Sequence, residues 1–306
     1  MITDNIIGIA GSGIRLATPY LYAAIGETFG QLSGVLNLGV DGIMLMGSFA
    51  AFLVAFKTGS LVLGLLAAVI VGGLMGLFMA FISVTMQAEQ GISGIGLYLF
   101  GLGMSELLFK KTLGTVQTVN GFAPISIPLL SEIPILGEIL FQQNILVYGA
   151  FLLVPVAWFV LNKTPLGLKV RAAGQNPEAA DSLGVNVNRI RYLTVTVGGM
   201  LAGIAGASLS IALLNLFQQN ITNGMGFIAV ALVYFGRWRP MGILVGALLF
   251  SMVNAFQIWA QVQGIGLPPD FMLMIPYIIT ILVLAAMVKQ RVRGPAALNK
   301  PFERGK

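Results

Sequence analysis

Apolar segments of about twenty residues recur along the chain, and their length constrains the fold more than any other feature of the sequence. A helix of this length spans the hydrocarbon core of a bilayer, whereas a transmembrane strand needs only about ten residues of alternating polarity. We expect nine such segments, each with ends uncertain by a few residues: 13–30, 35–56, 61–85, 92–109, 145–161, 192–214, 224–236, 241–260 and 271–288. The pattern predicts an all-α integral membrane protein, built as a polytopic bundle of about nine transmembrane helices.

The composition agrees with this class. The mean hydropathy is +0.91, and only 9% of the residues are charged, against about 25% in soluble domains. Residues 1–12 are polar and rich in glycine and lack a basic start, so we expect no cleavable signal peptide there.

The seventh segment, 224–236, is too short to cross the bilayer. At the helical rise it covers only about 20 Å of a core that is about 30 Å thick. We therefore expect a half-helix or re-entrant segment that lies inside the bundle.

Basic residues predict the orientation of the chain. Of the 17 Lys and Arg residues, 13 fall in three places: the 162–191 loop, the 237–240 turn and the stretch after residue 288. By the positive-inside rule this side is cytoplasmic, which places the C-terminus inside and, after an odd number of crossings, the N-terminus outside. The net charge of +6 is then an insertion signal rather than a nucleic-acid-binding patch, because the basic residues are dispersed.

The chain contains neither Cys nor His. Thiolate catalysis, disulfides, histidine proton relays and the usual zinc sites are therefore excluded, and we expect no metal site and no catalytic residue. A G-x-x-x-x-G-K-[ST] phosphate loop is also absent, so any ATP used by the system must be bound by another subunit.

Polar residues inside membrane segments are expensive and are therefore candidates for function. Asn37 and Asp41 are four residues apart and would share one face of a helix. They are candidates for a translocation path or gate; the alternative is a buried hydrogen-bonded pair that fixes a helix break in the glycine-rich run 34–39. Asn254 and Gln257, with Gln261 at the next turn, could form a polar stripe toward a pore or hydrogen bonds between helices.

Other features of the sequence are expected to be structural. Glu27 is expected at the interface, and Glu106 and Lys110 have the spacing of a helical ion pair. Glycines four residues apart recur in four segments and predict close helix packing. The external segment 110–144 contains an apolar run, 133–141, too short to span the membrane; it predicts an interfacial helix, a structural cap or a docking surface.

The 162–191 stretch is the one long polar stretch between apolar segments. Within it, Asn176 suits a helix N-cap, Pro177 the first helical position and Gly184 the left-handed position after a helix. The pattern predicts a short exposed helix over 177–183, on which we expect a partner to dock.

The motif Asn176-Pro177-Glu178-Ala179-Ala180, with Asp181 inside and Gly184 closing the Glu-Ala-Ala-x-x-x-Gly core, resembles the cytoplasmic coupling loop of bacterial ABC-importer permeases. The Ile-x-Leu-Pro ending of many sugar permeases is missing. The runs 33–42 and 236–240 are similar to those of nucleoside and simple-sugar uptake permeases, relatives of the ribose and branched-chain amino acid permeases, although Arg239 stands where an Asn is expected. The resemblance covers roughly residues 14–290.

This resemblance implies a type II ABC-importer-like fold in which 1–306 is a single transmembrane permease domain and 162–191 is its coupling loop. It implies a bacterial cytoplasmic membrane location, ATP-binding subunits that use ATP and Mg²⁺, a second permease that is a paralogue or a second copy, and an extracytoplasmic substrate-binding lipoprotein. Nucleosides, simple sugars and riboflavin-like heterocycles all remain possible substrates.

Two other classes stay open from the residues themselves. An ion-coupled secondary transporter would use an ionisable residue near the midplane, for which only the off-centre Asp41 is available. A membrane enzyme or scaffold is the remaining alternative.

Overall fold

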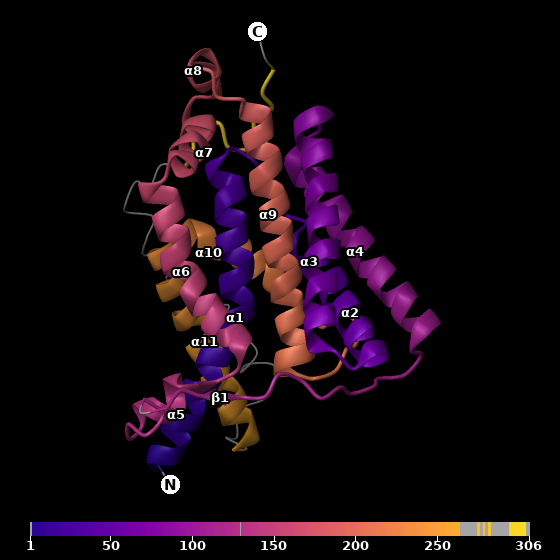
Figure 1. Cartoon of the computed structure of the whole chain (residues 1–306), viewed down its shortest axis with the longest axis vertical. Helices are drawn as coiled ribbons and strands as arrows, with labels where there is room; N and C mark the ends of the chain where they lie inside the picture. Colours follow the sequence, from indigo (N-terminus) through magenta and orange to yellow (C-terminus); the bar gives the residue numbers. More distant parts are fainter. Residues whose placement is uncertain are drawn as a thin grey trace.

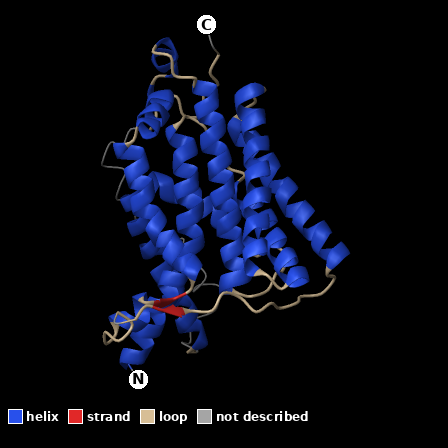
Figure 2. Ribbon diagram, in the orientation of Figure 1, coloured by secondary structure: helices blue, strands red, loops and turns tan. Residues whose placement is uncertain are grey.

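The computed structural model describes residues 2–128, 130–263 and 294–303, with a few single residues between 274 and 282. These residues form a bundle of long helices, and a small two-stranded sheet lies at one end of it (Figures 1 and 2). The elements are, in chain order, α1 (Ile2–Leu32), α2 (Val40–Thr58), α3 (Leu61–Ala80), η1 (Phe81–Thr85), α4 (Gln90–Thr112), β1 (Ile125–Ser126), α5 (Leu136–Leu140), β2 (Gln142–Gln143), α6 (Ile145–Lys163), α7 (Pro165–Gln175), α8 (Pro177–Ser182), α9 (Val187–Ser208), η2 (Leu209–Leu213), α10 (Met225–Phe235) and α11 (Pro240–Val262).

Within the described residues, six helices are long and apolar enough to cross a membrane: Val40–Thr58, Leu61–Thr85, Gln90–Thr112, Ile145–Lys163, Val187–Leu213 and Pro240–Val262. The π-helical turns η1 and η2 lengthen α3 and α9. The protein is therefore an all-α, multi-pass membrane protein, as the apolar segments predict. The segment expected at 271–288 falls outside the described residues apart from a few positions, and the total of nine segments stays a prediction.

Three segments differ from their predicted ends by five residues or more, among them the sixth, which was expected from residue 192 and begins at Val187. The first, expected at 13–30, is part of the 31-residue helix α1. The second, expected from residue 35, begins as a helix only at Val40. Between them Gly34 has a φ of 98°, a left-handed conformation that suits glycine, and the chain turns there before α2 starts.

The half-helix α10 is only 11 residues long, as its short apolar run predicts. It packs against α1, α2 and α11, and Ala229 and Val233 on it are fully buried. Neighbouring helices therefore cover it, which is how a short segment is tolerated at membrane depth.

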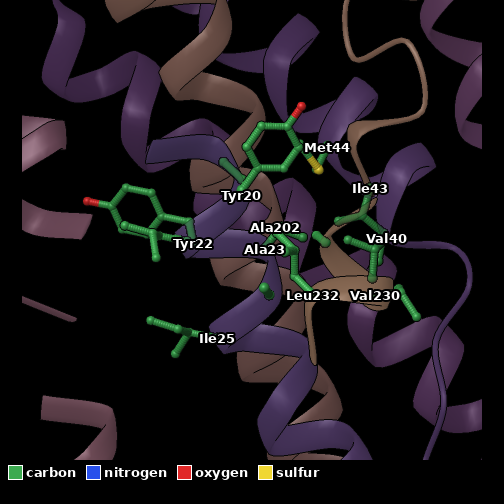
Figure 3. Close-up of a cluster of buried hydrophobic side chains, with 14 of the residues drawn as sticks. Tyr20, Tyr22, Ala23, Ile25, Val40, Ile43, Met44, Ala202, Val230 and Leu232 are labelled. Atoms are coloured by element: carbon green, nitrogen blue, oxygen red, sulfur yellow. The ribbon is translucent and has the colours of Figure 1, made fainter. Parts of the chain in front are cut away.

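Aliphatic and aromatic side chains of four helices meet in the core (Figure 3). Those labelled are Tyr20, Tyr22, Ala23 and Ile25 from α1, Val40, Ile43 and Met44 from α2, Ala202 from α9, and Val230 and Leu232 from α10. The core thus joins α1 to the starting turn of α2 and to the half-helix, the region that holds the buried polar residues described below.

Glycine contacts bring the helices close together, as their spacing predicts. A Cβ added to Gly26 would lie 2.9 Å from the Gly198 carbonyl oxygen, and one added to Gly76 would lie 2.8 Å from the Val195 carbonyl oxygen. These distances are shorter than real Cβ atoms allow, so α1 and α3 approach α9 at backbone contact.

The 110–144 segment lies at the end of the bundle where α1 begins (Figure 1). It contains the hairpin of β1 and β2, in which Ile125 pairs with Gln143, and the short helix α5. Next to it, Lys110 Nζ lies 2.6 Å from Glu106 Oε1, which confirms the exposed ion pair predicted from their spacing.

Candidate functional site

Asp41 is fully buried at the start of α2, and its carboxylate holds the first turn of α10. Its Oδ1 accepts a hydrogen bond of 2.7 Å from the Gly226 N–H, and its Oδ2 accepts one of 3.0 Å from the Thr222 hydroxyl. The N-cap of α10 is Gly224, which has no side chain to accept these bonds itself. Asp41 therefore caps, from another helix, N–H groups that would otherwise lack partners.

The absence of a side chain at Gly226 makes this contact possible. A Cβ at that position would collide with the Asp41 backbone and with its Cβ. The half-helix can therefore approach the start of α2 only at a glycine, and the carboxylate reaches the helix end directly.

Asn37 lies in the turn before α2 and not on its face. Its Oδ1 accepts a hydrogen bond of 2.9 Å from the Gly39 N–H, which stabilises the turn that leads into the helix. The expectation that Asn37 and Asp41 share one helical face is wrong, because helical geometry begins only at Val40. Asn37 instead supports the break between α1 and α2, whereas Asp41 holds the start of α10.

Glu27 is a second buried carboxylate at this break. Its Oε1 accepts hydrogen bonds from Gln31 Nε2 at 3.1 Å and from the Asn37 N–H at 3.0 Å. Gln31 Oε1 in turn accepts a bond of 2.8 Å from Trp238 Nε1. Only 4% of Glu27 is exposed, so its carboxylate is enclosed by the protein, and the network joins α1, the break and the 237–240 turn. Its position at the membrane interface stays a prediction.

The candidate residues on α11 do not behave as one stripe. Gln257 is buried, Asn254 is half-buried and Gln261 is exposed. α11 packs against α1, α6 and α10, so the buried Gln257 faces the bundle. The role of Asn254 and Gln257 in a translocation path stays a prediction.

The polar stretch forms two consecutive helices at the end of the bundle opposite the start of α1 (Figure 1). Asn176 Oδ1 accepts a hydrogen bond of 3.1 Å from the Ala179 N–H, and Gly184 adopts a φ of 84° after the helix. The predicted N-cap and glycine position are therefore present, and α8 ends at Ser182, one residue before the expected end. The preceding helix α7 was not expected; Thr164, whose Oγ1 caps Gly167 at 3.2 Å before Pro165, is the local signal that could have revealed it.

Side chains of α8 divide between solvent and the bundle. Glu178, Ala179 and Gly184 are exposed, and Leu183 just after the helix is 85% exposed. Ala180 is buried in a small apolar cluster with residues of α6, α7 and α9. The helix is thus anchored by one side chain and presents the others outward, as a docking surface would.

Sequence comparison identifies the protein family. Residues 9–284 match the model of the family described as branched-chain amino acid transport system, permease component. The chain belongs to this permease family. A permease of this kind is a transport subunit and not itself an enzyme.

Named relatives of this permease cover nearly its whole length. It is 37% identical to a protein of Haloferax volcanii provisionally named a glucose ABC transporter permease, over 97% of this chain and 98% of that one. It is 34% identical to the guanosine ABC transporter permease protein NupQ of Bacillus subtilis, over 95% and 94% of the two chains. It is also 34% identical to the nucleoside ABC transporter permease protein NupC of Lactococcus lactis, over 96% of both. A second guanosine permease protein of Bacillus subtilis, NupP, is 25% identical; no solved structure matches the permease.

Proposed function

We propose that this permease forms half of the translocation pore of an ATP-driven importer of nucleosides. Two observations support the substrate class: a guanosine and a nucleoside permease are each 34% identical over almost the whole chain. The observation that carries the importer mechanism is the capped, exposed helix α8 at one end of the bundle. Simple sugars are the second candidate, because the relative at 37% identity is named for glucose; riboflavin-like heterocycles are a third.

We propose nine membrane segments, one of them a half-helix, in a type II importer architecture, with 1–306 as a single permease domain. The six apolar helices, the 31-residue α1 and the half-helix α10 supply eight, and 271–288 supplies the ninth. The chain inserts in the bacterial cytoplasmic membrane with α7 and α8 inside, because the basic residues gather there. The N-terminus then lies outside.

Partners complete the importer. An ATP-binding subunit, which uses ATP and Mg²⁺, receives the coupling residues Asn176, Pro177, Glu178, Ala179, Ala180, Asp181 and Gly184. A second permease forms the other half of the pore; the two guanosine permeases of Bacillus subtilis favour a heterodimer. An extracytoplasmic binding lipoprotein delivers the substrate.

In this mechanism, closure of the ATPase dimer moves α8, and the bundle rocks between outward and inward access. α8 is suited to receive the force because its exposed side chains are held on an anchored, doubly capped turn. Asn37 and Asp41 lie at the break beside the half-helix, where a translocation path through broken helices would run.

The test is reconstitution of the complete importer in vesicles, with radiolabelled nucleoside uptake and ATP hydrolysis measured together. We expect ATP-dependent uptake of nucleosides, and we expect Glu178→Ala to lower the uptake per ATP hydrolysed. Glu138→Ala is the matched control, because it removes an exposed glutamate from α5 at the opposite end.

The outcomes separate the alternatives. Coupled hydrolysis without nucleoside uptake would keep the importer and move the substrate to sugars or flavins. Unchanged coupling in Glu178→Ala would contradict the role of α8. Uptake that persists without any ATPase partner would favour an ion-coupled secondary transporter.

A further inference from the structure

Residues 294–303, here called the tail, lie back on the bundle beside α7 and α8. The Ala297 N–H donates to the Gly174 carbonyl oxygen at 2.9 Å, and the Asn299 N–H donates to the Gly34 carbonyl oxygen at 3.2 Å. Gly174 is in the last turn of α7, and Gly34 is in the break between α1 and α2. The tail therefore connects the helix that precedes α8 to the break that leads to Asp41.

Arg191 of α9 is buried and binds both the tail and the break between α1 and α2. Its Nε donates to the Ser33 carbonyl oxygen at 3.1 Å and its Nη1 to the Lys300 carbonyl oxygen at 3.0 Å. The residue is only 1% exposed. Two of its donors have carbonyl partners, which tie the tail to the break in a defined geometry, whereas its Nη2 has no hydrogen-bond partner among the described residues.

Phe302 anchors the end of the tail beneath α8. It is 8% exposed and belongs to the apolar cluster that contains Ala180 of α8 together with Val170 and Ala173 of α7. Its carbonyl oxygen also accepts a bond of 3.3 Å from Gln87 Nε2. Part of the surface on which α8 rests is therefore supplied by the tail.

A groove between α8 and the tail has a volume of about 460 Å³ and is bordered by Asn176 and Glu178 on one side and by Lys300 and Glu303 on the other. The tail thus reaches the same surface that α8 presents. Elements that share a buried cluster, backbone hydrogen bonds and one groove move together, because packed interiors transmit displacement instead of absorbing it.

We propose that the tail is part of the coupling apparatus, with Phe302 and Arg191 as positioning residues that transmit movement of α8 to the break between α1 and α2. This inference rests on the proposed function. Force on α8 passes through Ala180 and Phe302 into the tail, then through Asn299 and Arg191 to Ser33 and Gly34. From there Glu27 and Asn37 carry it to the start of α2, where Asp41 holds the half-helix.

The test measures substrate molecules imported per ATP hydrolysed by the complete importer in vesicles. For Phe302→Ala we expect this ratio to fall about tenfold, in the range typical of mutations along a coupling network. The hydrolysis rate and the amount of ATPase that copurifies with the permease stay within about twofold of wild type, because the exposed residues of α8 are intact. Phe302→Leu keeps the apolar anchor and is expected to retain the wild-type ratio.

Arg191→Lys is the second test variant: it keeps the positive charge, but one ammonium cannot reproduce the two-pronged contact, so we expect loss of coupling. Arg189→Lys is the matched control. It makes the same kind of change on α9, at an exposed position that does not border the groove. We expect it to couple like wild type.

The failures of the two proposals are distinguishable. A wild-type complex without ATP-dependent uptake would contradict the proposed function. Wild-type coupling in both Phe302→Ala and Arg191→Lys would overturn the role of the tail alone. Loss of the copurified ATPase together with hydrolysis would also overturn it, since the tail would then serve assembly and not transmission.

Discussion

Asp41 stabilises a helix to which it does not belong. Its two oxygens accept from Gly226 and Thr222, which lie more than 180 residues further along the chain. The sequence suggested either a gate or a buried hydrogen-bonded pair with Asn37 at a helix break. The carboxylate is buried and hydrogen-bonded, but its partners lie at the start of the half-helix and Asn37 is not among them.

Replacement of this carboxylate is the first prediction at this scale. Asp41→Asn offers one acceptor oxygen in place of two and turns an N–H₂ group toward a donor. We expect the free energy of unfolding in detergent to fall by about 1–3 kcal/mol, the cost of a buried group left unsatisfied. Denaturation followed by intrinsic tryptophan fluorescence measures it.

Glu106→Gln is the control for Asp41→Asn. It removes another carboxylate of a membrane helix, but from an exposed pair with Lys110, and surface changes of this kind stay within about 0.5 kcal/mol. Equal stability losses in the two variants would contradict the capping role of Asp41.

At the scale of elements, α9 is the helix against which α1, α2 and α3 pack. Its glycines face glycines: Gly199 and Gly203 lie against Gly72, and Gly199 also lies against Gly76. The spacing in the sequence predicted close packing, because small residues four apart fall on one helical face. Which helices meet there is decided only by the tertiary structure.

A pair of glycine variants tests this interface. In Gly203→Ala the new methyl group would collide with the Ala68 carbonyl oxygen of α3, so we expect a loss of stability of about 1–3 kcal/mol, the cost of overpacking. In Gly96→Ala the methyl group meets nothing within 4 Å. Since alanine is the better helix former, we expect that variant to be neutral or more stable by up to about 1 kcal/mol.

The readout for both glycine variants is thermal unfolding in the same detergent. Similar destabilisation by the two substitutions would mean that the loss comes from a change within each helix and not from a collision between helices. That result would contradict the close packing of α3 against α9.

At the scale of the whole molecule, the two ends of the bundle differ. α7, α8 and the tail lie at one end, and α5, the hairpin and the start of α1 lie at the other (Figure 1). Basic residues gather in the stretches that form the first end. By the positive-inside rule, this asymmetry favours the proposed orientation, in which that end lies on the cytoplasmic side.

Single-cysteine labelling tests this orientation, because the natural chain has no cysteine of its own. A membrane-impermeant maleimide added to intact spheroplasts should label Glu138→Cys on α5 but not Ser182→Cys on α8, both of which are exposed positions. After the membrane is opened, both should react. Labelling of Ser182→Cys alone in sealed cells would reverse the proposed topology.

The sequence-based predictions that were confirmed depended on local features of the chain. The apolar runs predicted the long helices, the short run at 224–236 predicted α10, and Asn176, Pro177 and Gly184 predicted α8. Each depends on residues within a few positions of one another, so periodicity and capping reveal it. The start of α2 was misplaced because its run of apolar residues begins before the backbone becomes helical.

The sequence by itself determined the membrane class, the half-helix, the capped helix α8 and the charge asymmetry, because each depends on local composition or spacing. Only the tertiary structure decided that Asp41 caps α10, that Glu27 is buried, and that Arg191 and the tail fasten α8 to the break. Arg191 and Ser33 are 158 residues apart, and a pairing over such a distance leaves no periodic signal. It forms because a buried donor must find an acceptor wherever packing places one.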